Sequence, residues 1–191
     1  MSRPQLWLLA GGNGAGKSTF YRLFLQPRGV AFINADAIAR EIAPEAAEAA
    51  SYEAAIIASR LCRKALASRT SFCFETVFSH PSKIDLLGEA RAAGYEVNLV
   101  FIYLSDSALH LARVQQRVTE GGHYVPDDKV ASRLPRTQAN IAAALPLCDT
   151  LLVFDNSSAD DPFQHVASRS KGRVTGQLAY LPGWLAQVLA P

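Results

Sequence analysis

The sequence has few cysteines, a nearly balanced charge and no long hydrophobic run. Its three cysteines, Cys62, Cys73 and Cys148, are far apart and lack CxxC spacing, which favours small buried side chains over a metal site or a disulfide. Nineteen basic residues against 17 acidic ones give a net charge of +2, which does not indicate a nucleic-acid-binding surface. No apolar run approaches the roughly 20 residues that span a bilayer. We therefore expect a cytoplasmic protein that binds neither nucleic acid nor membrane.

The length of 191 residues suits one compact domain over residues 1–191, with 49% hydrophobic residues and a mean hydropathy of +0.07. Apolar runs alternate with segments of helical pattern. The predicted strands are Leu6–Ala10, Val30–Ile33, Phe72–Val77, Val97–Leu104 and Leu151–Phe154. The predicted helices are Lys17–Gln26, Pro44–Ser68, Ser82–Ala93, Asp106 to about Glu120, and Pro126 to about Leu145. Nearly continuous apolar strands between helices are typical of a parallel sheet covered on both faces.

This alternation predicts a three-layer α/β fold with a mostly parallel five-stranded sheet. The last 30 residues are less regular, and they predict a hairpin around Lys171–Gly172 and a short helix over Pro182–Leu189. No internal repeat or low-complexity segment is present in the sequence. A single domain of this class is the expectation for the whole chain.

The most informative stretch is GGNGAGKST, which follows the first predicted strand and opens the first predicted helix. It matches GxxxxGK[ST] in the strand–loop–helix context that a P-loop NTPase fold requires. Lys17 is expected to reach the β- and γ-phosphates, and the Ser18 hydroxyl to ligate Mg²⁺. A dinucleotide-binding GxGxxG fails in both registers, because Lys17 or Thr19 stands where its third glycine belongs. The expected nucleotide-binding residues are Gly11, Gly12, Asn13, Gly14, Ala15, Gly16, Lys17, Ser18 and Thr19.

Two carboxylates stand at the ends of predicted strands, where open α/β sheets bind their ligands. Asp36 is expected either to activate an acceptor hydroxyl or to cap the following helix. Glu75 lies in an apolar strand and is costly to bury, so it either forms an ion pair or enters the same crevice. His80 follows as a candidate substrate-binding residue or a solvated loop side chain. No Asp-Glu pair ends a hydrophobic strand and no NKxD motif occurs, which favours a small kinase over motor-type ATPases and GTPases.

Arginines form two pairs with helical spacing, Arg113 with Arg117 and Arg133 with Arg136. Each pair shares one helix face. The segment GGHYVPDD (Gly121–Asp128) lies between them, and its Gly and Pro content predicts a mobile lid. Arginines beside such a lid would stabilise the transferring phosphoryl or grip an anionic substrate, and the alternative is a solvated helix face.

Six blocks in this order resemble the zeta toxin family of P-loop kinases, in particular its short stand-alone branch. They are GGNGAGKS, NADAIA, FETVFSHPSK, GGHYVPDDK, RLPRTQANI and FDNS. The resemblance runs from Leu6 to Ser157, and the ETVFSHPSK and GGHYVP blocks are more specific than the P-loop. It implies a kinase that uses Mg²⁺ and ATP or GTP. The best-known members of the family phosphorylate the 3′-hydroxyl of the amino sugar of UDP-N-acetylglucosamine.

The resemblance also implies roles for individual residues. Lys17 and Ser18 would hold the phosphates and Mg²⁺, and Asp36 would be the base on the acceptor hydroxyl. Glu75 and Thr76 would line the acceptor pocket. The phosphoryl would be stabilised by arginines from the set Arg117, Arg133 and Arg136, with Arg113 as the substitute for Arg117. A nucleotide sugar is the implied substrate and an antitoxin protein the implied partner. The chain is shorter than the best-known toxins, so the kinase chemistry transfers more directly than the acceptor.

Two other functions fit the P-loop. A polynucleotide-end or nucleoside kinase would need a basic track with exposed aromatic side chains, and the balanced charge does not favour one. A nucleotide-binding regulatory module with little turnover would have no chemical need for Lys17, Asp36 and Glu75 together. Consumption of ATP with small-molecule acceptors distinguishes these alternatives from the small-molecule kinase.

Overall fold

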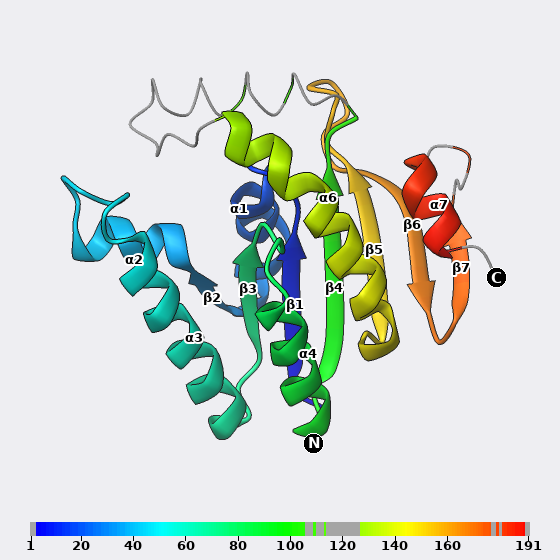
Figure 1. Ribbon diagram of the computed structural model, residues 1–191. Coiled ribbons are helices and arrows are strands. Elements are labelled where there is room, and N and C mark those ends of the chain that lie inside the picture. Colours follow the sequence, from blue (N-terminus) through cyan, green and yellow to red (C-terminus); the bar gives the residue numbers. More distant parts are fainter. Residues whose placement is uncertain are drawn as a thin grey trace.

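The computed structural model describes residues 3–105, 109, 113, 127–176, 179 and 181–189. Helices cover both faces of a single sheet, so the three-layer α/β prediction is confirmed (Figure 1). The strands are β1 (Gln5–Ala10), β2 (Ala31–Asn34), β3 (Phe72–Thr76), β4 (Glu96–Tyr103), β5 (Thr150–Asp155), β6 (Gln164–Ser170) and β7 (Arg173–Gly176). The α-helices are α1 (Lys17–Phe20), α2 (Ala35–Ile42), α3 (Ser51–Ser68), α4 (Ser82–Ala92), α6 (Asp127–Ala144) and α7 (Gly183–Leu189). The π- and 3₁₀-helical turns are η1 (Tyr21–Leu25), η2 (Gln26–Arg28) and η3 (Leu145–Leu147).

The sheet has seven strands in the order β2-β3-β1-β4-β5-β6-β7. The first five of these are parallel, and β6 and β7 are antiparallel to their neighbours. The predicted number of five strands was wrong, because the C-terminal hairpin pairs with β5 and extends the same sheet. The sequence of β6, QHVASRS, is too polar to indicate a buried strand. It is a strand because it pairs with β5, which supplies its backbone hydrogen bonds.

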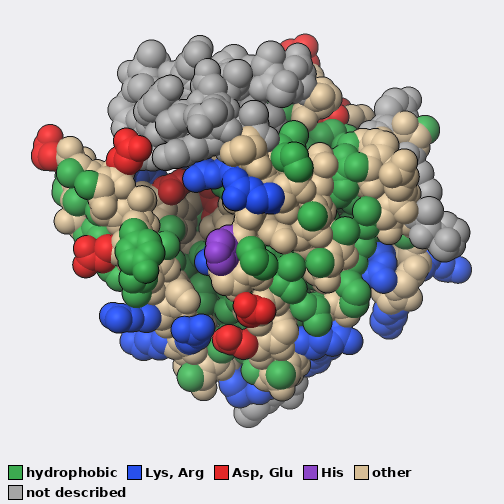
Figure 2. All heavy atoms as spheres, in the orientation of Figure 1, with side chains coloured by type: hydrophobic (Ala, Val, Ile, Leu, Met, Phe, Trp, Pro, Cys, Tyr) green, Lys and Arg blue, Asp and Glu red, His purple; other side chains and the backbone are tan. Residues whose placement is uncertain are grey.

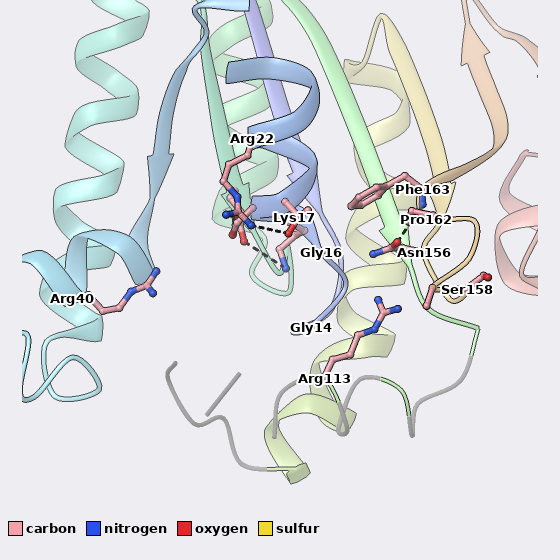
Figure 3. A pocket seen from close by; sticks show the side chains of 14 residues that line it. Gly14, Gly16, Lys17, Arg22, Arg40, Arg113, Asn156, Ser158, Pro162 and Phe163 are labelled. Carbon is pink, nitrogen blue, oxygen red and sulfur yellow. Dashed lines mark hydrogen bonds and ion pairs between the residues drawn. The ribbon is translucent and has the colours of Figure 1, made fainter. Parts of the chain in front are cut away.

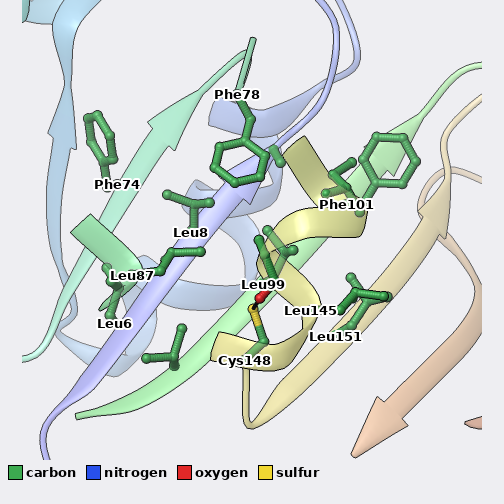
Figure 4. Close-up of a cluster of buried hydrophobic side chains, with 14 of the residues drawn as sticks. Leu6, Leu8, Phe74, Phe78, Leu87, Leu99, Phe101, Leu145, Cys148 and Leu151 are labelled. Atoms are coloured by element: carbon green, nitrogen blue, oxygen red, sulfur yellow. Dashed lines mark hydrogen bonds between the residues drawn. The ribbon is translucent and has the colours of Figure 1, made fainter. Parts of the chain in front are cut away.

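Two hydrophobic clusters hold the layers together. The larger cluster joins one face of the sheet to α3, α4, α6 and α7, and Leu8, Leu99 and Phe78 are fully buried in it (Figure 4). The smaller cluster joins the other face to α1 and η1 through Phe20 and Leu25. Strands β1 and β4 are therefore buried on both faces, which explains their almost uninterrupted apolar sequences.

The helices between β2 and β3 differ from the prediction of one helix over Pro44–Ser68. Two helices are present, α2 directly after β2 and α3 from Ser51. The alanine-rich segment 44–50 has high helix propensity, yet it is mostly exposed and packs little apolar surface. Helix α3 instead begins where a buried stripe starts, because tertiary packing stabilises helices more than propensity does. That stripe consists of Ala54, Ala58, Cys62 and Leu66.

The topology brings the carboxyl ends of the parallel strands to one edge of the sheet, the upper edge in Figure 1. The P-loop follows β1 at this edge, and α2 follows β2 there. All three cysteines are buried free thiols, as predicted. Within the described ranges, no helix is both long and apolar enough to cross a membrane.

Candidate active site

Glycines give the P-loop its close approach to neighbouring backbone. Gly11 has a φ of +153°, and a Cβ atom there would lie 2.2 Å from the carbonyl oxygen of Ile102 on β4. Gly16 begins α1 with a φ of +94°, in the left-handed region that glycine adopts without strain. The loop therefore lies tight against β4 and delivers its backbone N–H groups to the N-terminus of α1, where they attract anions.

Lys17 and Ser18 are both bound to Glu75. The Lys17 ammonium lies 3.8 Å from Glu75 Oε1 and donates a 2.9 Å hydrogen bond to the carbonyl of Gly12. The Ser18 hydroxyl donates a 2.6 Å bond to Glu75 Oε2. Lys17 is 7% exposed and Glu75 is 10% exposed, so this ion pair is buried. The two alternatives predicted for Glu75 are both observed, since it forms an ion pair with Lys17 and also lines the cavities beside the P-loop.

Asn34, and not Asp36, caps helix α2. The Asn34 side-chain oxygen accepts a 3.0 Å hydrogen bond from the backbone N–H of Ala37. Asp36 lies two residues after Asn34 and is exposed in the first turn of α2. Because the capping role is filled by its neighbour, the Asp36 carboxylate is available to the cleft. The capping role predicted as one alternative for Asp36 is therefore wrong, and its role as the base stays a prediction.

A cavity of about 580 Å³ opens over the P-loop. Its described lining carries four cations, Lys17, Arg22, Arg40 and Arg113, against the single carboxylate of Glu75. In Figure 3 the side chain of Arg113 points toward the space between Gly14 of the P-loop and Ser158. A positively charged cavity at a helix N-terminus fits a polyphosphate, so we refer to it as the donor cavity.

The loop that follows β5 closes one side of the donor cavity. Asn156 is 7% exposed, donates a 2.9 Å bond to the carbonyl of Ala15 and accepts one from the backbone N–H of Phe163. Phe163 has a left-handed φ of +59° and packs edge-on against Phe20. Asn156 belongs to the FDNS block that resembles the family, but the sequence predicted no role for it. Its position directly after a strand was the available signal, although Asn is equally common in turns.

A second cavity of about 380 Å³ lies beside the P-loop, between α2, α3 and β3, and we call it the acceptor cavity. Figure 2 shows the hollow between the α2–α3 side and α6, with basic and acidic side chains gathered in it. Lys17 and Glu75 line both this cavity and the donor cavity. The predicted residues that line the acceptor cavity are Asn13, Lys17, Asp36, Glu75, Thr76 and Arg133.

Helix α6 braces the wall of the acceptor cavity. Thr137 donates a 2.9 Å bond to the carbonyl of Val77, and Asn140 donates one of 2.9 Å to the carbonyl of Phe78. Phe78 is fully buried with a left-handed φ of +63°, and these bonds hold the chain in that conformation. Arg133, one turn before Thr137, reaches Asn13 in the P-loop at 3.5 Å.

Other predicted site residues lie elsewhere. Arg113 lines the donor cavity, not the acceptor cavity. His80 is exposed, and its ring bonds to Ser82 at 2.9 Å at the start of α4, outside the lining of both cavities. Arg136 is exposed and bonds within α6 to Ser132. Arg117 lies outside the described residues, as do residues 121–126 of the predicted lid Gly121–Asp128, and the last two residues of that segment begin helix α6.

The oxygen donors at the junction of the two cavities fit Mg²⁺. Ser18 and Glu75 offer a hydroxyl and a carboxylate, the hard ligands that this ion prefers. In the described part of the chain, no group of three or more His, Cys, Asp or Glu side chains could hold a metal ion. Proteins commonly hold Mg²⁺ with one or two side chains together with phosphate oxygens, so Ser18 and Glu75 could hold it beside a bound nucleotide.

A glycine loop between the central strand and α1, with the strand order β2-β3-β1-β4-β5, defines a P-loop kinase fold. The zeta toxin family model matches residues 1–161. The chain therefore belongs to the zeta toxin family.

Similar proteins share this architecture. An uncharacterized protein of Haemophilus influenzae is 33% identical over 140 residues, which is 70% of this chain and 99% of that protein. The complex of AvrRxo1-ORF1 with AvrRxo1-ORF2 and ATP superposes with a TM-score of 0.72 at 21% identity. The match covers 93% of this chain but 61% of the other, so this chain spans about three fifths of that length. The PezAT toxin–antitoxin system of Streptococcus pneumoniae matches with a TM-score of 0.67 and 16% identity, covering 99% of this chain and 78% of the other. At these identities the two solved structures share the fold.

Proposed function

We propose that the protein is an ATP-dependent small-molecule kinase that transfers the γ-phosphoryl group to a sugar hydroxyl. The observation that carries this proposal is the shared wall of two cavities. A cation-lined donor cavity and an acceptor cavity with an exposed carboxylate meet at Lys17 and Glu75. A transferring group held at this junction would be in reach of both sides. The family and the ATP-bound neighbour support the same chemistry.

In the proposed reaction, Lys17 and the backbone N–H groups of the P-loop bind the β- and γ-phosphates. Ser18 and Glu75 would hold Mg²⁺, which when bound offsets charge on the phosphates. Asp36 accepts the proton of the acceptor hydroxyl, and the oxygen of that hydroxyl forms a bond to the γ-phosphorus. The bond from that phosphorus to the β–γ bridging oxygen breaks, and ADP leaves with the electron pair. Arg133 and Arg113 flank the junction from the two cavities and stabilise the transferring charge.

We propose a nucleotide sugar related to UDP-N-acetylglucosamine as the acceptor. The acceptor cavity combines a carboxylate, basic side chains and the exposed ring of Tyr52. Such a set suits a ligand that has hydroxyls, an anionic group and a planar ring. Residue roles for Thr76 and for the set Arg113, Arg117, Arg133 and Arg136 belong to the same proposal.

The test is the substitution Asp36→Asn. Removal of the base should lower kcat by about 10²- to 10⁴-fold, while the dissociation constant for ATP stays within about twofold. The value of kcat is measured by ATP consumption with a panel of nucleotide sugars, and mass spectrometry identifies the product. Calorimetry measures the dissociation constant for ATP. Glu41→Gln, an exposed carboxylate on the same helix, is the matched control and should behave as wild type. Full transfer activity in Asp36→Asn would show that Asp36 is not the base.

We further propose that a cognate antitoxin protein restrains the activity in the cytoplasm. The supporting observations are the family and the neighbours, which include a toxin–antitoxin system. Induced expression of the wild-type chain should arrest bacterial growth, and expression of Asp36→Asn should not. Equal growth with both chains would argue against a toxin.

A further inference from the structure

Lys83 is a basic side chain of the acceptor cavity to which the reaction above gives no role. It lies in the first turn of α4, directly after His80-Pro81-Ser82. Cations are disfavoured at that end of a helix by its dipole. The side chain is only partly exposed, and its ammonium lies 5.2 Å from the centroid of the Phe74 ring. A cation held in an unfavourable place, beside a ligand cavity, requires an explanation.

The charges of the acceptor cavity do not balance. Its described lining carries Lys17, Asp36, Glu75, Lys83 and Arg133. Lys17 and Glu75 offset each other as a buried pair 3.8 Å apart. One carboxylate, Asp36, then faces two cations. Among the described residues, no carboxylate oxygen lies within 4.0 Å of the Lys83 ammonium. The cavity is therefore poised to receive negative charge.

A purely structural role explains Lys83 less well. A cation over an aromatic ring contributes about 0.5–1 kcal/mol at a partly exposed site. Lys83 also borders the hollow between α3 and α4, where the carboxylates of Asp85 and Glu89 are present, and neither lies within 4.0 Å of the Lys83 ammonium. Glu89, however, pairs with Arg63 at 3.7 Å. Burial lowers the pKa of Lys83, with the Cys62 thiol acting weakly in the opposite direction. An incoming anion would offset this cost of burial.

We propose that the Lys83 ammonium binds an anionic group of the acceptor, a phosphate, diphosphate or carboxylate, while Asp36 takes the proton of its hydroxyl. This inference rests on the proposed kinase function and assigns the residue that recognises the anionic group of the acceptor. Lys83 is thus a specificity-determining residue, and Phe74 positions it. Neutral free sugars lack the group that Lys83 recognises, so they should be poor acceptors.

Kinetics with paired acceptors tests the proposal. We expect Lys83→Ala to raise KM for UDP-N-acetylglucosamine by about 10- to 100-fold, the loss of one charge-assisted contact. The values of kcat and of KM for ATP should change less than threefold, and Lys83→Arg should recover most of the affinity. N-acetylglucosamine should be a poor acceptor for wild type and Lys83→Ala alike. Gluconate as a third acceptor distinguishes a carboxylate from a phosphate ester. Lys64→Ala, an exposed lysine on α3, is the control.

Direct binding separates this inference from the proposed function. Protein saturated with a non-hydrolysable ATP analogue and Mg²⁺ should bind inorganic diphosphate, and Lys83→Ala should lower that affinity at least tenfold. Circular dichroism and the melting temperature check that each variant is folded. Diphosphate binding that is absent in wild type, or equal in both proteins, overturns the role of Lys83. If binding follows Lys83 but no acceptor is phosphorylated, the kinase proposal fails and the anion site stands.

Discussion

Substitution of Glu75 by glutamine tests the junction of the two cavities. The change keeps the shape of the side chain and removes the charge that faces Lys17 at 3.8 Å. Both side chains are at most 10% exposed, so solvent screens the pair little. Loss of one partner of a buried ion pair costs about 3 kcal/mol. We therefore expect the free energy of unfolding of the nucleotide-free protein to fall by about 3 kcal/mol, measured by urea titration.

The same substitution should move nucleotide affinity in opposite directions with and without metal. Without Mg²⁺, the triphosphate replaces the lost negative charge at Lys17. Part of the penalty in the free protein is then relieved on binding, and ATP should bind up to about tenfold more tightly than to wild type. With Mg²⁺ present, the metal loses a carboxylate ligand, and ATP should bind more weakly than to wild type. Calorimetry with and without EDTA measures both values.

A matched control is available in the exposed pair between Arg63 and Glu89, whose side chains are 67% and 45% exposed. Glu89→Gln should lower the free energy of unfolding by less than about 1 kcal/mol, because water and salt screen the charges. It should leave ATP affinity unchanged in both conditions. If Glu75→Gln is no more destabilising than Glu89→Gln and has the wild-type response to Mg²⁺, the buried pair and the metal role of Glu75 are both refuted.

Two further predictions follow from the loop and the core. Gly11→Ala places a Cβ atom 2.2 Å from the carbonyl oxygen of Ile102, so it should abolish ATP binding in calorimetry. The control Gly29→Ala has open space around the new Cβ, so it should lower the free energy of unfolding by only about 1 kcal/mol and keep ATP binding. Equal ATP affinities of the two variants would contradict the close approach at Gly11. Burial raises the pKa of Cys62 to about 12 from an ordinary value of 9.0, so the stability that this thiol contributes is complete below about pH 9 and is lost as the pH rises toward 12. Iodoacetamide at pH 8.5 should accordingly label Cys62 in urea but not in the folded protein, and labelling of the folded protein would contradict its burial.

The parallel part of the fold could be predicted because its strands are buried on both faces. The predicted strand Leu6–Ala10 differs from β1 by one residue, since an uninterrupted apolar run leaves little choice of boundary. The polar strand β6 could not be assigned to the sheet, because its place there depends on pairing with β5 and its own residues have no pattern that indicates this pairing. The same limit hid the start of α3, which depends on packing against the sheet and not on the helix propensity of the segment before it.

The candidate site was predicted where a residue's chemistry is tied to its place on a strand. Lys17 follows β1, Asp36 follows β2 and Glu75 lies near the end of β3. All three line the acceptor cavity, since parallel strands end at one edge. Asn156 was missed because an asparagine in a turn has no distinctive pattern, and only the folded chain shows its bond to the P-loop. The spacing of Arg133 and Arg136 placed both on one helix, but whether an arginine faces a cavity or solvent depends on how that helix sits against the sheet.

Lys17 and Glu75, which line both cavities, would couple the donor and acceptor sides of the proposed reaction. Glu75 binds Lys17 and Ser18, so the groups proposed to bind phosphate and metal have a carboxylate partner. Phosphate oxygens that arrive at Lys17 compete with that carboxylate, and the proposed metal would draw Glu75 toward the donor side. A metal bound to Glu75 would offset the charge of that carboxylate, while Lys83 and Arg133 remain in the acceptor cavity. The bound metal should therefore strengthen the attraction of an anionic acceptor, which predicts that ATP with Mg²⁺ binds before the acceptor.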